Sequence, residues 1–264
     1  MKLKFQKYQA HGNDFIMVDN LKGHYNAFKT DLSNISKICS RNFGVGSDGI
    51  IFINHHKDFP FEMEFFNPDG SKSFCGNGAR CAVYFANQLD LQLDSPIFYA
   101  IDGSHEYFLS GESVRIQMNN VDQIEELSKD VFILNTGSPH YVHFSDLLFD
   151  EDDFISFSKK IRFSKDFIED GINVNLVKFL TSFSIKMRTY ERGVENETLS
   201  CGTGVTAAAL SFGFRQSLFG SHKIEVETMG GLLTVEFHQN QKGVFENIWL
   251  TGNAKFVYEG SFKL

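Results

Sequence analysis

The sequence predicts an α/β (α+β) fold of two similar domains, each built of strands around a central buried helix. Alternating or apolar runs typical of strands outnumber helical segments along the chain. A glycine-rich motif also occurs twice, because Phe74 to Gly78 reads Phe-Cys-Gly-Asn-Gly and Ser200 to Gly204 reads Ser-Cys-Gly-Thr-Gly. A small, apolar, helix-favouring run follows each copy. The motif cysteines, Cys75 and Cys201, lie 126 positions apart in 264 residues, so each half of the chain carries one copy.

The first half alternates strands with two helices. Asp31 is the expected cap of a helix that ends near Cys39, and a second helix is expected from Gly78 to about Leu89. The second helix has small apolar residues on all sides, which indicates burial nearly all round. Polar turns are expected at residues 11–14 and 67–70, where Pro and Gly occupy turn positions. The expected strands span residues 2–9, 14–18, 50–54, 61–66, 96–100, 105–110 and 113–118.

The second half repeats this order. A turn at residues 136–140 separates two strands, a helix begins at Asp152, and another helix follows Gly204. Gly12 precedes Cys75 by 63 positions and Gly137 precedes Cys201 by 64. The expected strands span residues 131–135, 141–144, 172–179, 183–190, 222–228, 231–237, 246–250 and 254–258. The alternative, a chance likeness of two glycine-rich turns, does not account for this agreement in order and spacing.

The expected domain boundary lies in the polar, acidic stretch at residues 119–127. The N-terminal domain, with Cys75, is predicted to span residues 1–119 and about 255–264. The C-terminal domain, with Cys201, is predicted to span residues 120–254.

Composition limits the class of protein. The formal net charge is −8, with no long basic run, which argues against nucleic acid or an anionic membrane as the partner. The N-terminus has no apolar stretch of signal-peptide length, and no run of 18 apolar residues occurs, so we expect a cytoplasmic protein. The four cysteines, expected to be reduced there, form no CxxC and no zinc-ligand pair, so no metal is expected.

The repeated motif predicts an anion site at each helix start. A helix N-terminus has unpaired N–H groups and partial positive charge, and glycine lets a ligand approach the backbone. Gly76, Asn77, Gly202 and Thr203 are therefore candidates to hold a carboxylate.

The same position favours acid–base chemistry by the two motif cysteines. A free thiol has a pKa of about 8.5 and is roughly 3% ionised at pH 7, and a helix N-terminus lowers that pKa. A thiolate on one face of an amino acid α-carbon and a thiol on the other can invert the stereocentre, with no metal and no pyridoxal phosphate. The alternative is burial as small hydrophobic residues, which is the reading we give to Cys39 and Cys81.

Six segments together resemble diaminopimelate epimerase. They span nearly the whole chain in the family's order and are His11–Phe15, Phe66–Gly70, Cys75–Cys81, Gly137–His140, Glu191–Gly193 and Cys201–Gly204. The resemblance implies two similar domains, each a mixed, mostly antiparallel sheet or barrel wrapped around a helix, with the site in the cleft between them. It also implies a homodimer, no cofactor, and interconversion of LL- and meso-2,6-diaminopimelate for lysine and peptidoglycan precursors.

The resemblance also assigns roles to individual residues. Cys75 and Cys201 are implied as proton donor and acceptor, and His140 and Glu191 as supporting groups. His140 is equally well read as a structural histidine, Glu191 as a loop cap, and Asn13 and Asn67 as turn residues. The implied substrate-binding residues, which would pair both polar ends of diaminopimelate, are Asn13, Asn67, Gly76, Asn77, Asn173, Glu191, Arg192, Gly202 and Thr203.

Three positions depart from the family pattern. Ser138 stands where the family often has Asn, and Gly49 where some members have a Gln that contacts substrate. The loop at residues 193–200 looks one residue longer than is common. No departure removes a catalytic group.

Other functions stay open at this point. A proline or hydroxyproline racemase would share the chemistry, although Arg192 and the asparagines suit a substrate with a charged distal end better. A non-catalytic carboxylate- or phosphate-binding module would use the same helix starts. A redox switch between Cys75 and Cys201 is the third alternative.

Overall fold

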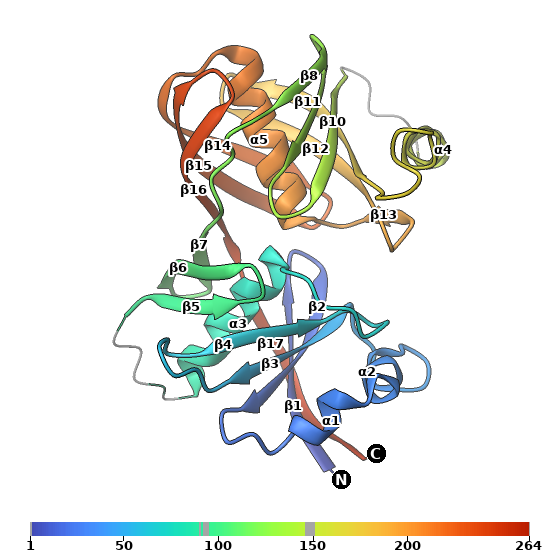
Figure 1. The fold of residues 1–264 in the computed structure, drawn as a ribbon, viewed down its shortest axis with the longest axis vertical. Helices are drawn as coiled ribbons and strands as arrows, with labels where there is room; N and C mark the ends of the chain where they lie inside the picture. The colour runs from blue at the N-terminus through green and yellow to red at the C-terminus, as the bar shows by residue number, and fades with distance from the viewer. Residues whose placement is uncertain (1, 90, 92–94, 146–150, 264) are drawn as a thin grey trace. The chain divides into compact units, whose positions relative to one another are not determined.

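The computed structural model describes residues 2–89, 91, 95–145 and 151–263. The chain forms two compact units, the first from residues 1–116 and 252–264 and the second from residues 117–251. Strands dominate both units, and few helices are present (Figure 1). Each unit is described by itself below.

Eight strands of the first unit are joined one to the next by hydrogen bonds. Their order is β17 (Lys255–Lys263), β1 (Lys2–Ala10), β2 (Asn13–Asn20), β3 (Gly49–Asn54), β4 (Glu62–Phe66), β5 (Ile97–Ala100), β6 (Gly103–Ser110) and β7 (Ser113–Gln117). The β2–β3 and β4–β5 pairs are parallel, and the other pairs are antiparallel.

The second unit repeats this pairing pattern strand for strand. Its order is β8 (Glu125–Ser128), β9 (Val131–Asn135), β10 (Pro139–Phe144), β11 (Asn173–Thr181), β12 (Ser184–Glu191), β14 (Gly220–Thr228), β15 (Gly231–Gln241) and β16 (Val244–Asn253). The parallel pairs, β10–β11 and β12–β14, occupy the same two places in the order. A short extra strand, β13 (Asn196–Thr198), pairs with β12. The predicted fold, two related mixed and mostly antiparallel units, is confirmed.

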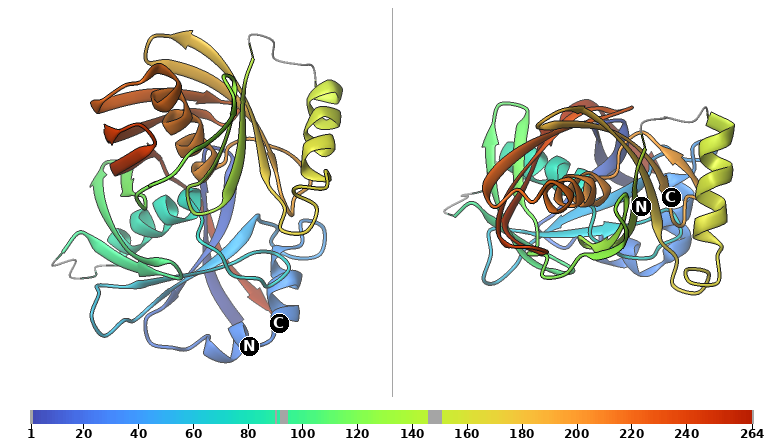
Figure 2. Two further views of the ribbon diagram at one scale, coloured as in Figure 1. Left: turned by 45° about the horizontal axis from the view of Figure 1, so that its top comes forward. Right: turned by 90° about the horizontal axis from the view of Figure 1, so that it is seen from above.

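Each unit is built around one buried helix. In α3 (Gly76–Gln88) ten of 13 residues are buried, and in α5 (Gly202–Gln216) 13 of 15 are buried. Small residues on all sides allow strands to approach each helix closely, and Figure 2 shows the strands of the second unit curving around α5. This burial fixes the first turn of each helix, where the motif residues lie.

Strand alternation in the first unit separates two cores. Phe15 and Ile51 pack against the α3 face, whereas Ile16 and Ile50 point to the opposite face. That face is covered by α1 (Asn26–Thr30) and α2 (Leu32–Cys39). Since both faces are buried, β2 and β3 read as apolar runs in the sequence. Cys81 and Cys39 lie in these two cores, as packing residues should.

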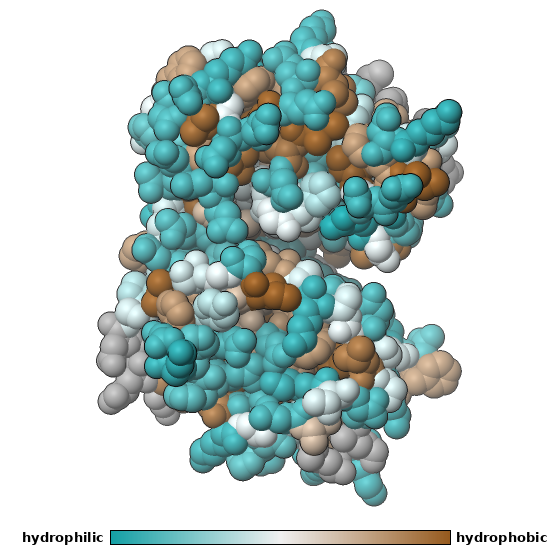
Figure 3. All heavy atoms as spheres, viewed as in Figure 1, coloured by the Kyte–Doolittle hydropathy of each residue, from teal (hydrophilic) through white to brown (hydrophobic). Residues whose placement is uncertain are grey.

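The remaining described helix is α4 (Glu151–Arg162), whose Phe154 packs on strands of the second unit. No helix in the described ranges is long and apolar enough to cross a membrane. Hydrophilic side chains cover most of the face seen in Figure 3, and apolar groups are scattered among them.

Candidate active-site residues

Cys75 is the residue that precedes α3 and caps it. Its backbone is extended (φ −134°, ψ 112°), and its Sγ accepts a hydrogen bond from Gly78 N at 3.4 Å. Ala79 N bonds to the Cys75 carbonyl at 2.8 Å. The helix itself offers no acceptor to the N–H groups of Gly76 and Asn77. The sulfur therefore lies at the positive end of the helix dipole. It is beside the N–H groups that we expect to donate hydrogen bonds to the substrate carboxylate.

Asn13 and Asn77 lie beside Cys75 in the first unit. A two-residue turn with left-handed His11 (φ 54°) and Gly12 (φ 84°) pairs Ala10 with Asn13 and so fixes where Asn13 begins β2. Asn13 Oδ1 accepts hydrogen bonds from Asn77 Nδ2 at 3.2 Å and from Cys75 Sγ at 3.8 Å.

Arg80 is a site residue whose role the sequence did not reveal. Its guanidinium is fully buried and donates through NH2 to Asn77 Oδ1 at 2.5 Å, with His11 Nδ1 at 3.4 Å. Its Nε and NH1 have no hydrogen-bond partner in the described structure. Burial lowers the pKa of Arg80 to about 10, while the neighbouring Cys81 and Cys75 act in the opposite direction. At neutral pH the Cys75 site thus contains a buried cation.

Acidic and basic side chains support Asn13 from the other side. Asn13 Nδ2 donates to Asp48 Oδ2 at 2.6 Å, and Arg41 bonds to both Asp48 and Asp14 at 2.7 Å. Lys7 pairs with Asp14 at 2.5 Å. Burial tends to raise the pKa of Asp14, but hydrogen bonds from Arg41 and Lys7 outweigh it and lower that pKa. The amide of Asn13 is therefore held in one orientation.

Asn67 lies in the turn that follows β4. Its Nδ2 donates to the carbonyl oxygen of Ser71 at 3.2 Å and to the hydroxyls of Ser71 and Ser73 at 3.1 and 3.2 Å. These contacts all lie within the turn, as expected if Asn67 is a turn residue.

Cys201 occupies the N-cap position of α5, as Cys75 does in α3, although its side chain makes no capping hydrogen bond. Its backbone is again extended (φ −119°, ψ 116°), and Val205 N bonds to its carbonyl at 2.8 Å. The Cys201 side chain is nearly buried, at 9% exposure, and its Sγ lies 3.3 Å from Thr203 Oγ1. The two cysteines therefore occupy equivalent positions in the two units.

A hydrogen-bonded cluster of buried side chains and the half-buried Ser138 joins Cys201 to β10 and β11. Thr203 Oγ1 lies 3.0 Å from His140 Nε2 and 3.0 Å from Ser138 Oγ, and Ser138 Oγ lies 2.9 Å from His140 Nε2. Asn173 Nδ2 donates to Ser138 Oγ at 3.1 Å. Burial, and secondly the charge of Arg192, lowers the pKa of His140 to about 3, so this imidazole is neutral at pH 7.

Asn175 completes this cluster and was missed in the sequence. Its Nδ2 lies 3.0 Å from His140 Nδ1, and it is fully buried. The signal was present in the alternation of β11, because Asn173 and Asn175 share one face of a strand that is buried on both faces.

Glu191 is the last residue of β12, and Arg192 follows it. Arg192 N donates to Asn173 Oδ1 at 2.9 Å, and Arg192 NH1 donates to the Asp170 carbonyl at 2.6 Å. Glu191 Oε1 accepts from Thr198 Oγ1 at 2.5 Å, across the β12–β13 pair.

The structure shows the surroundings of the three positions that depart from the family pattern. Ser138 keeps a polar role, since its hydroxyl bonds within the His140 cluster. A Cβ at Gly49 would lie 2.2 Å from the Phe65 ring and 2.7 Å from the Phe66 carbonyl, so no glutamine fits there without rearrangement. The longer loop contains β13, and Gly193 (φ 88°) and Glu195 (φ 55°) adopt left-handed backbone in its turn.

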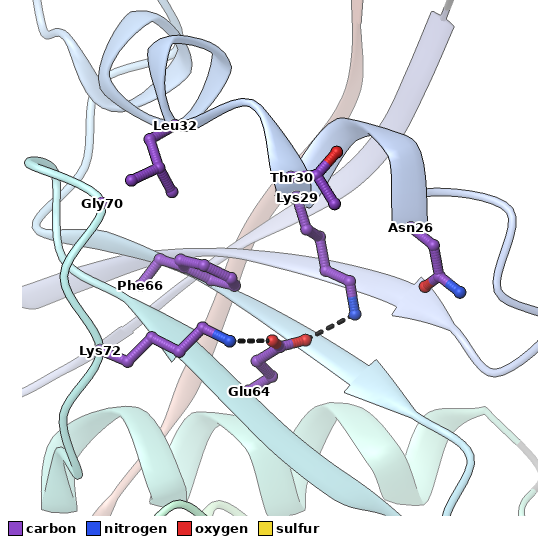
Figure 4. A pocket seen from close by; sticks show the side chains of 8 residues that line it. All are labelled: Asn26, Lys29, Thr30, Leu32, Glu64, Phe66, Gly70 and Lys72. Atoms are coloured by element: carbon purple, nitrogen blue, oxygen red, sulfur yellow. Dashed lines mark hydrogen bonds and ion pairs between the residues drawn. The ribbon is translucent and has the colours of Figure 1, made fainter.

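A surface pocket of about 610 Å³ in the first unit contains none of the predicted site residues. Glu64 lies between Lys29 and Lys72, 2.5 and 2.6 Å from their Nζ atoms (Figure 4). Both lysines pair with this one carboxylate, so each charged group of the trio has a partner. Within the described residues, no group of three or more His, Cys, Asp or Glu side chains could hold a metal ion.

Solved structures with low sequence identity share this fold. A phenazine biosynthesis protein of the PhzF family from Bacillus anthracis matches with a TM-score of 0.74 at 13% identity, covering 100% of both chains. A probable proline racemase from Agrobacterium radiobacter matches with a TM-score of 0.71 at 11% identity, covering 99% of this chain and 93% of that one. At such identities the likeness concerns the fold alone.

Sequence comparison is more specific. The family model described as Diaminopimelate epimerase matches residues 5–125 and 132–257. A protein named diaminopimelate epimerase from Flavobacterium psychrophilum is 42% identical over 259 residues, which cover 97% of this chain and 99% of that protein. One of the same name from Aquifex aeolicus is 36% identical, over 98% and 97% of the two chains. The chain therefore belongs to the diaminopimelate epimerase family.

Proposed function

We propose that this protein is an isomerase that interconverts LL- and meso-2,6-diaminopimelate, on the route to lysine and peptidoglycan precursors. The observation that carries the proposal is the matched placement of Cys75 and Cys201, each as the capping residue of its unit's central helix. Relatives named diaminopimelate epimerase, which this chain resembles over nearly its full length, support the choice of substrate.

The reaction needs one base and one acid on opposite faces of the α-carbon. The thiolate of one cysteine takes the α-proton and becomes a thiol, while the electron pair of the broken C–H bond is delocalised into the substrate carboxylate. The thiol of the other cysteine then gives its proton to the opposite face and becomes a thiolate. Atoms and charge balance, nothing is oxidised or reduced, and the reverse reaction exchanges the two roles.

First-turn N–H groups would stabilise the charge that develops on the carboxylate. Gly76 and Asn77 at α3, with Gly202 and Thr203 at α5, are the residues we assign to this task. For catalysis the two sulfurs must flank one α-carbon. We propose two domains, residues 1–119 with about 255–264, which carry Cys75, and residues 120–254, which carry Cys201.

The far end of the substrate requires an ammonium acceptor and a carboxylate donor. We assign Asn13, Asn67, Asn173, Glu191 and Arg192 to it, because amides supply both donors and acceptors and arginine pairs with carboxylate. A substrate without this end leaves those groups unpaired, which disfavours proline.

Deuterium incorporation tests the proposal. In D2O, LL-diaminopimelate should yield meso product with deuterium at the inverted α-carbon, because the thiol that returns the proton has exchanged with solvent. Cys75→Ala and Cys201→Ala should each lower epimerisation at least about a hundredfold. Proline, tested in parallel, should not be turned over. Meso product formed by the Cys75→Ala chain at the wild-type rate, or turnover of proline faster than that of diaminopimelate, contradicts the assignment.

We also propose a cytoplasmic homodimer that binds neither nucleic acid nor membrane. Strand β17 supports a dimer, because it pairs with β1 and carries exposed apolar side chains. Phe256, Val257 and Tyr258 are 44%, 52% and 43% exposed. Light scattering coupled to size exclusion should give twice the 30.0 kDa chain mass, and a Val257→Lys chain should give a smaller mass. A wild-type monomer at micromolar concentration contradicts the dimer.

A further inference from the structure

Asn175 is a fully buried amide that bridges three strands of the second unit. Its Nδ2 lies 3.0 Å from His140 Nδ1 on β10 and donates to the Tyr141 carbonyl at 3.3 Å. Its Oδ1 accepts from Thr189 Oγ1 of β12 at 3.0 Å. Every polar atom of the side chain is thus bonded.

These partners fix which way the amide faces. The Tyr141 carbonyl can only accept a hydrogen bond, so the group that faces it must be the NH2 of Asn175. The same NH2 faces His140 Nδ1, which must therefore accept and cannot carry a proton. His140 is then the neutral tautomer with its hydrogen on Nε2. The low pKa of His140 agrees with this state, and Arg192 is the charged group that acts on the ring.

The Nε2 hydrogen sets the direction of the remaining bonds. The single Nε2 hydrogen faces Ser138 Oγ and Thr203 Oγ1, at 2.9 and 3.0 Å, so neither hydroxyl can donate to the ring. Ser138 accepts from His140 and from Asn173, which uses both of its lone pairs, so its own hydrogen goes to Thr203 Oγ1, 3.0 Å away. Thr203 consequently keeps its own hydrogen for Cys201 Sγ, 3.3 Å away. A hydrogen bond donated to sulfur stabilises a thiolate more than a thiol.

We propose that Asn175 is a positioning residue, which holds His140 in the Nε2–H tautomer and thereby directs the Thr203 hydroxyl toward the sulfur of Cys201. Its effect is to favour the thiolate of Cys201. The catalytic importance of this effect rests on the proposed function, whereas the tautomer and the thiolate can be measured without any substrate.

Nitrogen-15 NMR of the full chain tests the first step. At pH 7 the His140 signals, assigned with a His140→Gln chain, should show a proton on Nε2 and none on Nδ1. In Asn175→Asp the carboxylate can only accept, so Nδ1 should gain a proton. The matched control is Asn240→Asp, which makes the same charge change at an exposed residue of the same unit and should leave the signals unchanged.

A wild-type ring with its proton on Nδ1 would overturn the proposal, and this measurement needs no variant of Asn175 to fold. The proposal also fails if folded Asn175→Asp keeps Nδ1 unprotonated.

Alkylation of Cys201 tests the second step. With Cys75→Ala as the background, the iodoacetamide rate at Cys201 should shift to higher pH by about one unit in Asn175→Leu, which is roughly tenfold slower at neutral pH. With Thr203→Val added, Asn175→Leu should have no further effect, because the hydroxyl through which it acts is gone. A merely structural role would leave the pH profile in place.

The two proposals fail separately. An unchanged alkylation profile in folded Asn175→Leu removes the role of Asn175 and leaves the epimerase assignment standing. If the tautomer and alkylation results are as expected but the wild-type chain does not turn over diaminopimelate, only the epimerase assignment is refuted.

Discussion

At the scale of single residues, the two cysteine sites differ although their backbones match. Cys75 lies near a buried guanidinium, that of Arg80, and Cys201 lies near a neutral imidazole, that of His140. A two-base reaction needs the thiols to alternate between roles, so unequal surroundings are expected to favour different protonation states.

His140 should make stability depend on pH. Its folded pKa of about 3 lies below the value of about 6.5 in an unfolded chain, so below about pH 6.5 the unfolded chain binds a proton that the folded chain does not. The free energy of unfolding should therefore fall as pH falls from about 6.5 toward 3, by up to about 1.4 kcal/mol per pH unit from this group.

Urea unfolding of the wild type and of His140→Gln at several pH values isolates this contribution, since other groups cancel in the difference. A difference that does not change between pH 6 and pH 4 would contradict the neutral buried state.

Arg80 should matter more for activity than for stability. Arg80→Met removes a buried cation with two nitrogens that have no hydrogen-bond partner, but it also removes the donor to Asn77 Oδ1. The change in unfolding free energy should therefore stay within about 2 kcal/mol. Epimerase kcat/KM should fall at least about tenfold, because Asn77 loses its fixed orientation. Unchanged kcat/KM in a folded Arg80→Met chain would make the guanidinium dispensable.

At the scale of elements, the third residue after each cysteine is a glycine. A Cβ at Gly204 of α5 would lie 2.7 Å from Asn175 Oδ1 and 3.3 Å from His140 Cε1. A Cβ at Gly78 of α3 would meet the flexible ends of Ile51 and Met63, at 2.9 and 3.4 Å. Gly204 thus faces a hydrogen-bonded cluster that cannot easily move, whereas Gly78 faces side-chain ends that can.

We predict opposite outcomes for alanine at these two positions. Alanine gains about 1 kcal/mol over glycine in a helix, which should leave Gly78→Ala near wild-type stability. Gly204→Ala should lose about 1–3 kcal/mol, because the buried hydrogen-bonded cluster must move. Urea unfolding measures both, and equal stabilities would refute the contrast.

Most strands and both central helices were predictable because they depend on local periodicity and on the repeat. β8, β13 and α1 were missed: β8 is exposed throughout and polar, and β13 and α1 are only three and five residues long.

At the site, the helix starts and Asn13 were predictable from motifs. Asn175 belongs to no motif. The alternation of β11 placed it on the face of Asn173, but its partner His140 lies 35 positions away and is brought near only by the parallel pairing of β10 and β11.

At the scale of the molecule, the chain returns to its first unit at the end. Residues 252–264 belong with residues 1–116, and β17 pairs antiparallel with β1 over nearly its whole length. The second unit, in contrast, is one continuous segment.

Removal of residues 255–264 should therefore affect the units unequally. Hydrogen exchange should become faster in β1 and α3 of the first unit, which loses a paired strand, while α5 keeps its protection. Epimerase activity should be lost with the Cys75 site. Uniform loss of protection in both units would show that the two fold as one.

The same return of the chain has a consequence for synthesis on the ribosome. Domains made in order usually fold from the N-terminus onward. Here the unit that is begun first lacks β17 until residues 255–263 have emerged, whereas residues 117–251 are complete earlier. The nascent protein is thus expected to acquire the Cys201 half before the Cys75 half. Until then β1 keeps an unpaired edge, a surface that chaperones can protect.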